Sequence, residues 1–261
     1  MCQIQFDLHQ DFYLYPDGWG QAQLEDITKL LDSVITEFYT NLDLAQITRK
    51  PVYVINSKTR IPPTDYPEIV KSEKYNSIYL NTSGQFWSMY SYQFAHELCH
   101  HIIDSDFYKI NDKFGWFEET LCELASIFCI DKMSQTWLTN PPYQNWRDYS
   151  TELADYVKEI FERPENKISI PFKTWLTENL DALFKDRYKR TENRIVALQL
   201  FEIFKNNPKI WMTIQYLKFI KVAEGMTFEN FINAWTKLVP DDLKELLNEI
   251  KIAMSYGKVS S

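Results

Sequence analysis

Along the first half of the chain, the spacing between apolar residues changes from one segment to the next. Some spacings are typical of helices and others of strands. The first period is helical, because within residues 21–44 apolar side chains recur every three or four positions, at Leu24, Ile27, Leu31, Val34, Ile35 and Phe38. PVYVINS (51–57) is short and rich in β-branched residues, NSIYLN (76–81) resembles it, and the proline-rich loop IPPTDYP lies between them. We therefore expect one helix with a buried face, followed by two strands.

Two longer apolar segments return to the helical period. Residues 85–103 and WFEETLCELASIFCIDKMSQTWL (116–138) are each expected to form a long helix, with Thr82 or Ser83 available to cap the first. TNPPYQNW (139–146) then interrupts the pattern with two consecutive prolines, which cannot continue a helix. We place a domain boundary there, between residues 1–140 and 141–261.

The second half of the chain carries almost no strand signal. Helical periods recur at about 150–162, 172–186, 191–206, 209–224, 228–238 and 241–254, and no residue pattern repeats from one to the next. The sequence therefore predicts an α+β fold, with a small sheet and two long helices in the N-terminal domain and an all-helical C-terminal region.

Composition and charge argue against nucleic acids and membranes as binding partners. The chain has 45% hydrophobic and 25% charged residues, so it can bury a large core, and its net charge of −8 comes without a block of Lys or Arg. We therefore expect no nucleic-acid partner and no binding to an anionic membrane surface. We also expect no membrane span, because lysines at positions 209, 218 and 221 interrupt the nearest apolar run.

The N-terminal sequence and the cysteines indicate in which cellular compartment the protein is expected. MCQIQFDLHQDFYLYPDG lacks the basic segment and apolar core that mark a signal peptide. Four cysteines are too few for a disulfide scaffold, and Cys99, Cys122 and Cys129 lie in apolar helical segments, where a free thiol behaves as a small buried hydrophobe. A cytoplasmic protein fits both observations.

Three of the four histidines fall in AHELCHH (95–101). On a helix, His96 and His100 lie one turn apart on the same face, about 6 Å along the axis, so both imidazoles can reach one metal ion. Glu97 stands beside the first of them and can take a proton from a water that the ion activates. This H-E-x-x-H pattern is typical of zinc peptidases, although a buried, hydrogen-bonded His pair has the same spacing. His101 points about 100° away and is expected to pack.

A catalytic zinc site needs a third protein ligand and leaves its fourth position to water. Asp104 would lie about 12 Å along the helix from His96, too far to share an ion with it. Asp106 stands six residues after His100, the ligand position of metzincins, but those enzymes turn the chain at a glycine three residues after the second His. Ile103 occupies that position here, and a β-branched residue resists the positive φ of such a turn.

The segment WFEETLCE (116–123) offers a third ligand on the next helix. Eighteen residues separate Glu119 from His100, and WFEE is similar to the W-x-N-E pattern of gluzincins, the zinc peptidases that include thermolysin and the aminopeptidases related to leukotriene hydrolase. The resemblance covers residues 75–138 and implies a zincin-like domain in which His96, His100 and Glu119 hold Zn²⁺. It also implies that Glu123, one turn further along the same face, accepts a hydrogen bond from His96 and fixes its tautomer.

Other assignments of this helix stay open. Glu118 is adjacent to Glu119, and Glu123 could itself bind the ion. All three glutamates could instead form a solvated stripe, or the first two could stabilise the helix N-terminus. Cys99 and Cys122 can in principle bind zinc, but core packing explains both thiols, and Cys99 is expected to face away from the His pair.

The sequence thus predicts a zinc metallopeptidase that acts on a peptide or protein substrate, with Glu97 as general base and then general acid. Gluzincins also use a downstream His, Tyr or Arg to stabilise the oxyanion, and no His follows His101. The candidates are Tyr149, Arg187, Tyr188 and Arg194. The alternatives are a non-catalytic zinc scaffold and a metal-free helical interaction protein. A fourth protein ligand such as a Cys, in place of the open position, would favour the scaffold.

Overall fold

The computed structural model describes residues 3–47, 49–104 and 112–255. The chain forms two compact units whose segments alternate along the sequence. The first contains residues 1–40, 44–102 and 125–158, and the second contains 41–43, 103–124 and 159–261. The predicted division at residue 140 concerns domains that fold separately, which these units do not test, and it stays a prediction.

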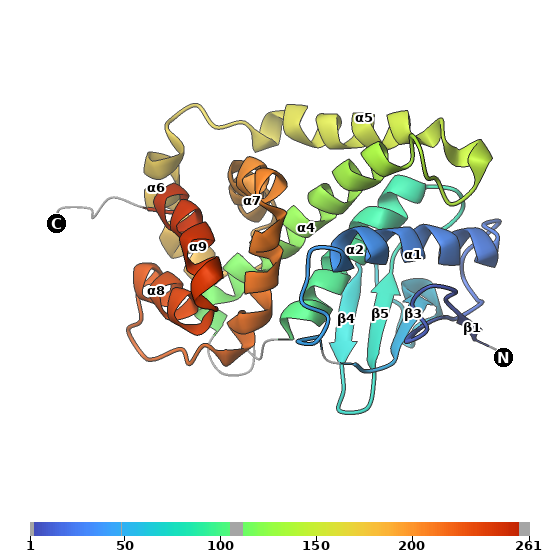
Figure 1. Cartoon of the computed structure of the whole chain (residues 1–261), viewed down its shortest axis with the longest axis horizontal. Helices are drawn as coiled ribbons and strands as arrows, with labels where there is room; N and C mark the ends of the chain where they lie inside the picture. Colours follow the sequence, from blue (N-terminus) through green and yellow to red (C-terminus); the bar gives the residue numbers. More distant parts are fainter. Residues whose placement is uncertain (1–2, 48, 105–111, 256–261) are drawn as a thin grey trace. The chain divides into compact units, whose positions relative to one another are not determined.

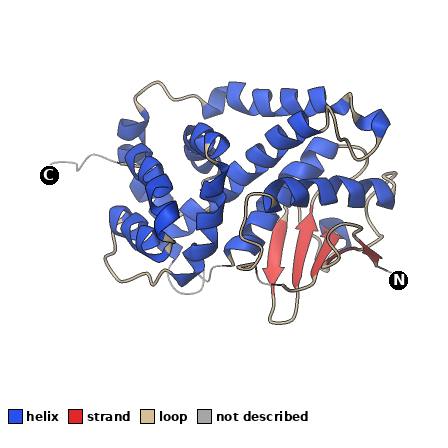
Figure 2. Cartoon of the chain, in the orientation of Figure 1, coloured by secondary structure: helices blue, strands red, loops and turns tan. Residues whose placement is uncertain are grey.

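The first unit contains a five-stranded sheet, in the order β1-β2-β3-β5-β4 (Figures 1 and 2). Its strands are β1 (Ile4–Gln5), β2 (Phe12–Leu14), β3 (Val52–Asn56), β4 (Glu68–Lys71) and β5 (Asn76–Leu80). β2, β3 and β5 run parallel, whereas β1 and β4 pair antiparallel at the two edges. β3 and β5 confirm the two predicted strands, and β1, β2 and β4 are strands that the sequence pattern did not predict.

Two helices of this unit were also predicted. α1 (Leu24–Tyr39) buries the apolar positions that define its period, and α2 (Trp87–Ile103) carries the AHELCHH segment. α2 begins after Gly84, whose φ of 68° lies in the left-handed region that glycine adopts without strain. The helix starts at Trp87, three residues after Gly84, so neither Thr82 nor Ser83 directly precedes it as a cap.

Aromatic side chains fill much of the core of the first unit. The Trp137 ring lies 5.6 Å from Trp146, which in turn lies 5.4 Å from Trp87 on α2. The Trp137 Nε1 hydrogen donates to Ser33 Oγ of α1 at 2.8 Å, so the polar atom of this buried ring has a partner. The loop that carries the two prolines, residues 139–146, is thereby packed against the helices.

α4 (Gly115–Thr136) is one uninterrupted helix that contributes its first part to the second unit and its remainder to the first. It confirms the helix predicted at 116–138. α5 (Tyr149–Glu162) follows it. Short 3-10 turns lie at η1 (Ser57–Thr59), η2 (Asp112–Phe114), η3 (Gln144–Trp146) and η4 (Pro164–Asn166).

The rest of the second unit is helical in the residues described, as predicted. It comprises α6 (Phe172–Lys185), α7 (Arg190–Asn206), η5 (Pro208–Phe219), α8 (Phe228–Leu238) and α9 (Asp241–Ala253). η5 is a 3-10 helix where an α-helix was expected. The core contains Phe114, whose ring stacks on Phe231 at 4.5 Å, and Trp235, which donates to the Thr213 carbonyl at 2.8 Å.

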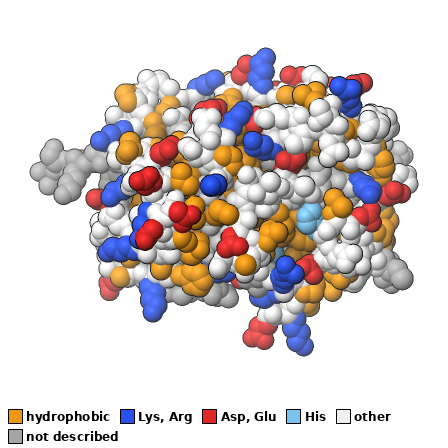
Figure 3. Space-filling model, viewed as in Figure 1, with side chains coloured by type: hydrophobic (Ala, Val, Ile, Leu, Met, Phe, Trp, Pro, Cys, Tyr) orange, Lys and Arg blue, Asp and Glu red, His pale blue; other side chains and the backbone are white. Residues whose placement is uncertain are grey.

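The structure is thus of mixed α+β class with one small sheet, which confirms the predicted class. Within the described residues, no helix is both long and apolar enough to cross a membrane. On the face shown in Figure 3, acidic and basic side chains are interspersed among hydrophobic ones. The net negative charge is therefore not gathered into one patch on this face.

Candidate metal centre

α2 brings the two motif histidines together, as their spacing predicts. The ring centroids of His96 and His100 lie 5.2 Å apart, with an angle of 65° between the ring planes. His100 is buried at 8% exposure, whereas His96 is half-buried. The pair therefore offers two imidazole nitrogens on one face of the helix, partly shielded from water.

A hydrogen bond within the first unit fixes how α4 lies against α2. Ser126 Oγ of α4 donates to the Tyr92 carbonyl of α2 at 2.9 Å. Cys122 precedes Ser126 by one turn, and His96 follows Tyr92 by one turn. Because Cys122 also lies beside His96, the two helices run antiparallel at this point.

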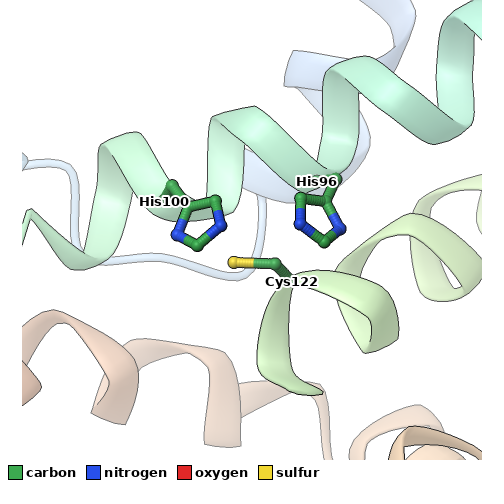
Figure 4. Close-up of side chains that lie close together, drawn as sticks. All are labelled: His96, His100 and Cys122. Carbon is green, nitrogen blue, oxygen red and sulfur yellow. The ribbon is translucent and has the colours of Figure 1, made fainter. Parts of the chain in front are cut away.

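Cys122 completes a group of three metal-ligating side chains. The best-placed ligand atoms of His96, His100 and Cys122 all lie within 4.8 Å of one another (Figure 4). Zn–N bonds of about 2.0 Å and Zn–S bonds of about 2.3 Å place two ligands of one tetrahedral ion roughly 3.3–3.6 Å apart. Small side-chain movements would therefore let these three atoms share an ion. Two imidazoles and a thiol also form a donor set that suits zinc.

Glu97 and His101 flank this pair on the same helix. Glu97, the predicted general base, is buried at 4% exposure. His101 is also buried, and its Nδ1 accepts a hydrogen bond from the Asn76 side-chain amide of β5 at 2.8 Å. Its ring meets Phe12 of β2 edge-on at 6.3 Å. His101 thus joins the motif helix to the sheet, in agreement with the expected packing role.

The predicted third ligand, Glu119, forms an ion pair within the second unit. Its Oε1 accepts from Arg187 Nε at 3.1 Å and from Arg187 Nη2 at 3.0 Å. Glu123, predicted to bond His96, accepts a hydrogen bond from Arg194 Nε at 3.2 Å. These side chains lie on α4 with Cys122, but the group of three described above contains no carboxylate. Whether Glu119 binds a metal and Glu123 contacts His96 stay predictions.

The remaining sequence candidates have varied surroundings. Glu118 is buried at 1% exposure, which argues against a solvated stripe at that position. Tyr149 Oη lies 3.3 Å from Ser88 Oγ of α2, and Tyr188 is largely exposed. Asp104, the first residue after α2, has a φ of 45°, so the left-handed residue stands one position after Ile103. Asp106 lies outside the described residues.

The cysteines that the structure describes are buried. Cys99, Cys122 and Cys129 form no disulfide among the described residues, and their side chains are fully buried. Burial, together with the Glu37 carboxylate, raises the pKa of the Cys129 thiol well above its usual value, so this side chain is neutral at physiological pH. Cys129 therefore matches the expectation of a small core hydrophobe.

Nothing in the sequence indicated the two ion pairs on α4, because Arg187 and Arg194 lie about 70 positions from their glutamate partners. From the sequence, these two arginines were considered only as candidates for stabilising the oxyanion.

Comparison with known proteins adds no assignment: no protein-family model, curated protein or solved structure matches this chain. The site is therefore argued from its own side chains.

Proposed function

We propose that the protein is a zinc-dependent metallopeptidase with a zincin-like catalytic domain. One observation carries the proposal: His96 and His100 stand side by side on α2, and a third donor from α4 lies within 4.8 Å of both. The gluzincin-type site predicted from the sequence uses Glu119 of the same helix as the third ligand, and Cys122 is the other candidate for that donor. Two donors from one helix and one from the next would leave a fourth position for water, as catalytic zinc requires.

Zinc at this position would polarise a substrate carbonyl and lower the pKa of a bound water to about 7. Glu97 supplies the proton transfers in this proposal. Its carboxylate takes a proton from the attacking water and delivers it to the departing amine nitrogen, so that one side chain serves as base and then as acid. The burial of Glu97 keeps bulk water from competing for that proton. The substrate class is a peptide or protein.

The test begins with metal analysis of the purified protein after dialysis, followed by proteolysis of an unstructured protein such as casein. We expect about one zinc per chain. Glu97→Gln should keep its zinc and lose about 10²- to 10⁴-fold in turnover, because general acid–base catalysis contributes that much. Glu152→Gln, at an exposed site on α5, is the matched control and should leave both unchanged.

Two results would overturn the proposal. Full activity in Glu97→Gln would remove the assigned base. A wild-type protein without zinc would remove the cofactor on which the reaction depends.

One observation favours a second function, a non-catalytic zinc scaffold. The Cys122 thiol is fully buried beside the two imidazoles, and thiolate ligands are common in closed structural sites. If Cys122 and Glu119 both bound the ion, the site would have four protein ligands and no place for water. Zinc that neither exchanges with solvent water nor binds a hydroxamate inhibitor would favour this scaffold over the peptidase.

A further inference from the structure

The first unit contains a cavity that the proposed function does not use. Its volume is about 200 Å³, below the roughly 300–1,000 Å³ of pockets for drug-sized ligands, so it suits a smaller molecule. Its lining comes from residues 8–12, from Tyr39 at the end of α1, from residues 44, 47, 49 and 50, and from His101 of α2. All of these belong to the same compact unit.

Aromatic rings form part of the cavity wall. The buried Phe12 ring of β2 meets two other rings edge-on, with its centroid 6.4 Å from Tyr39 and 6.3 Å from His101. The His9 ring meets Tyr39 in the same way at 5.6 Å. Exposed aliphatic side chains also line the cavity, from Leu8 and Leu44. The cavity can therefore cover an apolar group of a ligand, which favours binding.

Three polar side chains of the lining can bind a ligand directly. The Tyr39 hydroxyl has no hydrogen-bond partner among the residues that the structure describes, and neither Asp11 nor Arg49 forms an ion pair within those residues. Burial raises the pKa of the Tyr39 phenol, the Asp11 carboxylate adds to this shift, and the Arg49 guanidinium opposes it. The neutral hydroxyl therefore feels both charges, and it can donate and accept a hydrogen bond.

Two further polar residues of the lining contact the protein itself. His9 Nδ1 lies 2.9 Å from Asp32 Oδ1, and Lys50 Nζ donates to the Ser72 carbonyl at 3.2 Å. These contacts hold both side chains toward neighbouring segments. A ligand would therefore meet a carboxylate, a guanidinium and a hydroxyl that come from three separate parts of the chain.

We propose that this cavity binds a free α-amino acid with an apolar side chain. Such a zwitterion has a carboxylate that two N–H groups of Arg49 can bind and an ammonium group that can donate to Asp11. The Tyr39 hydroxyl can bond either group, and the apolar side chain would contact the aromatic wall. A simple anion would leave Asp11 without a partner, and a simple cation would leave Arg49 without one. The inference goes beyond the proposed peptidase and does not depend on it.

A ligand series tests this class by isothermal titration calorimetry on the full chain. L-leucine is the probe, and three compounds each lack one of its groups: 4-methylpentanoate the ammonium, L-leucinol the carboxylate and glycine the side chain. None contains a peptide bond, so a peptidase cannot cleave them. We expect leucine to bind and each of the others to bind roughly 10- to 100-fold more weakly, because a hydrogen bond to a charged group and a buried leucine side chain each contribute that much.

Variants test the residues. Arg49→Gln and Asp11→Asn should each weaken leucine binding about 10-fold or more, and Tyr39→Phe about 2- to 10-fold, because a neutral hydrogen bond contributes less. Arg49→Gln should also lose the preference for leucine over leucinol. Arg147→Gln and Asp155→Asn are the matched controls, since they remove exposed charges of the same unit outside the cavity, and they should leave the affinity unchanged. Thermal unfolding of each variant checks that it folds.

Three results would overturn the inference. The first is wild-type protein that binds no leucine. The second is wild-type protein that binds leucinol and 4-methylpentanoate as tightly as leucine, since the two charges would then have no role. The third is unchanged leucine affinity in both Arg49→Gln and Asp11→Asn, which would place the amino acid elsewhere. None of these measurements involves zinc or Glu97, so they leave the peptidase proposal to its own test.

Discussion

α4 presents two stripes of side chains that differ in chemistry and in partners. The first, with Cys122 and Ser126, meets α2 and the two motif histidines through neutral side chains. The second, with Glu119 and Glu123, meets Arg187 and Arg194 through ion pairs. In each stripe the two residues are four positions apart, so each pair lies along one face of the helix.

The comparison shows that side chains close together on one helix can have partners of different chemistry. A glutamate and a cysteine three residues apart on one helix are both plausible zinc ligands by residue type and position. Cys122 lies in a group with the two histidines, and Glu119 pairs with the buried guanidinium of Arg187. Opposite charges draw the carboxylates to the arginines, whereas the neutral thiol packs against α2.

Removing Arg187 should have the largest effect on stability. Arg187→Gln removes the cation that donates to the buried Glu119 carboxylate and should lower the free energy of unfolding by about 3–5 kcal/mol. Arg194→Gln should cost less, because Arg194 is more exposed than Arg187. Urea unfolding of the metal-free protein measures both.

A double variant sharpens this prediction. Arg187→Gln with Glu119→Gln removes both charges, so it should regain much of the lost stability. A loss in the double variant equal to the sum of the losses in Arg187→Gln and Glu119→Gln alone would show that the pair has no coupling.

Removing the hydrogen bond of the neutral stripe should have a smaller effect. Ser126→Ala loses the bond to Tyr92 and should cost about 0.5–1.5 kcal/mol in unfolding free energy. Ser134→Ala is the matched control, because Ser134 donates to Asp131 of its own helix at 2.7 Å. If Ser126→Ala weakens zinc binding and Ser134→Ala does not, the register of α2 against α4 positions the third ligand. Equal zinc affinity in both would separate that register from the metal site.

The smallest expected effect lies at the end of α4, where Thr136 Oγ1 donates to Glu37 Oε1 of α1 at 2.6 Å. Burial raises the pKa of Glu37 above its ordinary 4.5, although this bond opposes the shift. As the pH rises, the unfolded chain therefore loses the Glu37 proton before the native protein does, and native stability falls.

Glu37→Gln removes the carboxyl group and with it the cost of ionising a buried side chain. The variant should be slightly more stable than wild type at about pH 7, and the gain should vanish below the unfolded pKa, where both states carry the proton. Thermal unfolding of both proteins at about pH 7 and at a pH below the unfolded pKa measures the difference. A gain that persisted at low pH would trace the effect to packing instead of ionisation.

The elements that the sequence predicted are those with long, regular patterns. α1, α2 and α4 each bury apolar side chains at helical spacing over at least 16 residues. β1 and β2 have only two and three residues, too few for an alternating pattern to emerge. η5 was expected to be an α-helix because its buried residues, such as Ile210, Ile214 and Leu217, recur at spacings that both helix types allow.

By itself, the sequence determined that His96 and His100 share a face of one helix, with Glu97 beside them, because that follows from helical geometry alone. It also determined that the next helix carries several candidate donors between Glu118 and Glu123. Only the tertiary structure grouped the Cys122 thiol with the two imidazoles and paired Glu119 and Glu123 with arginines. The reason is physical: these contacts join helices and arginines that are far apart in the sequence, and such long-range pairings leave no local mark in it.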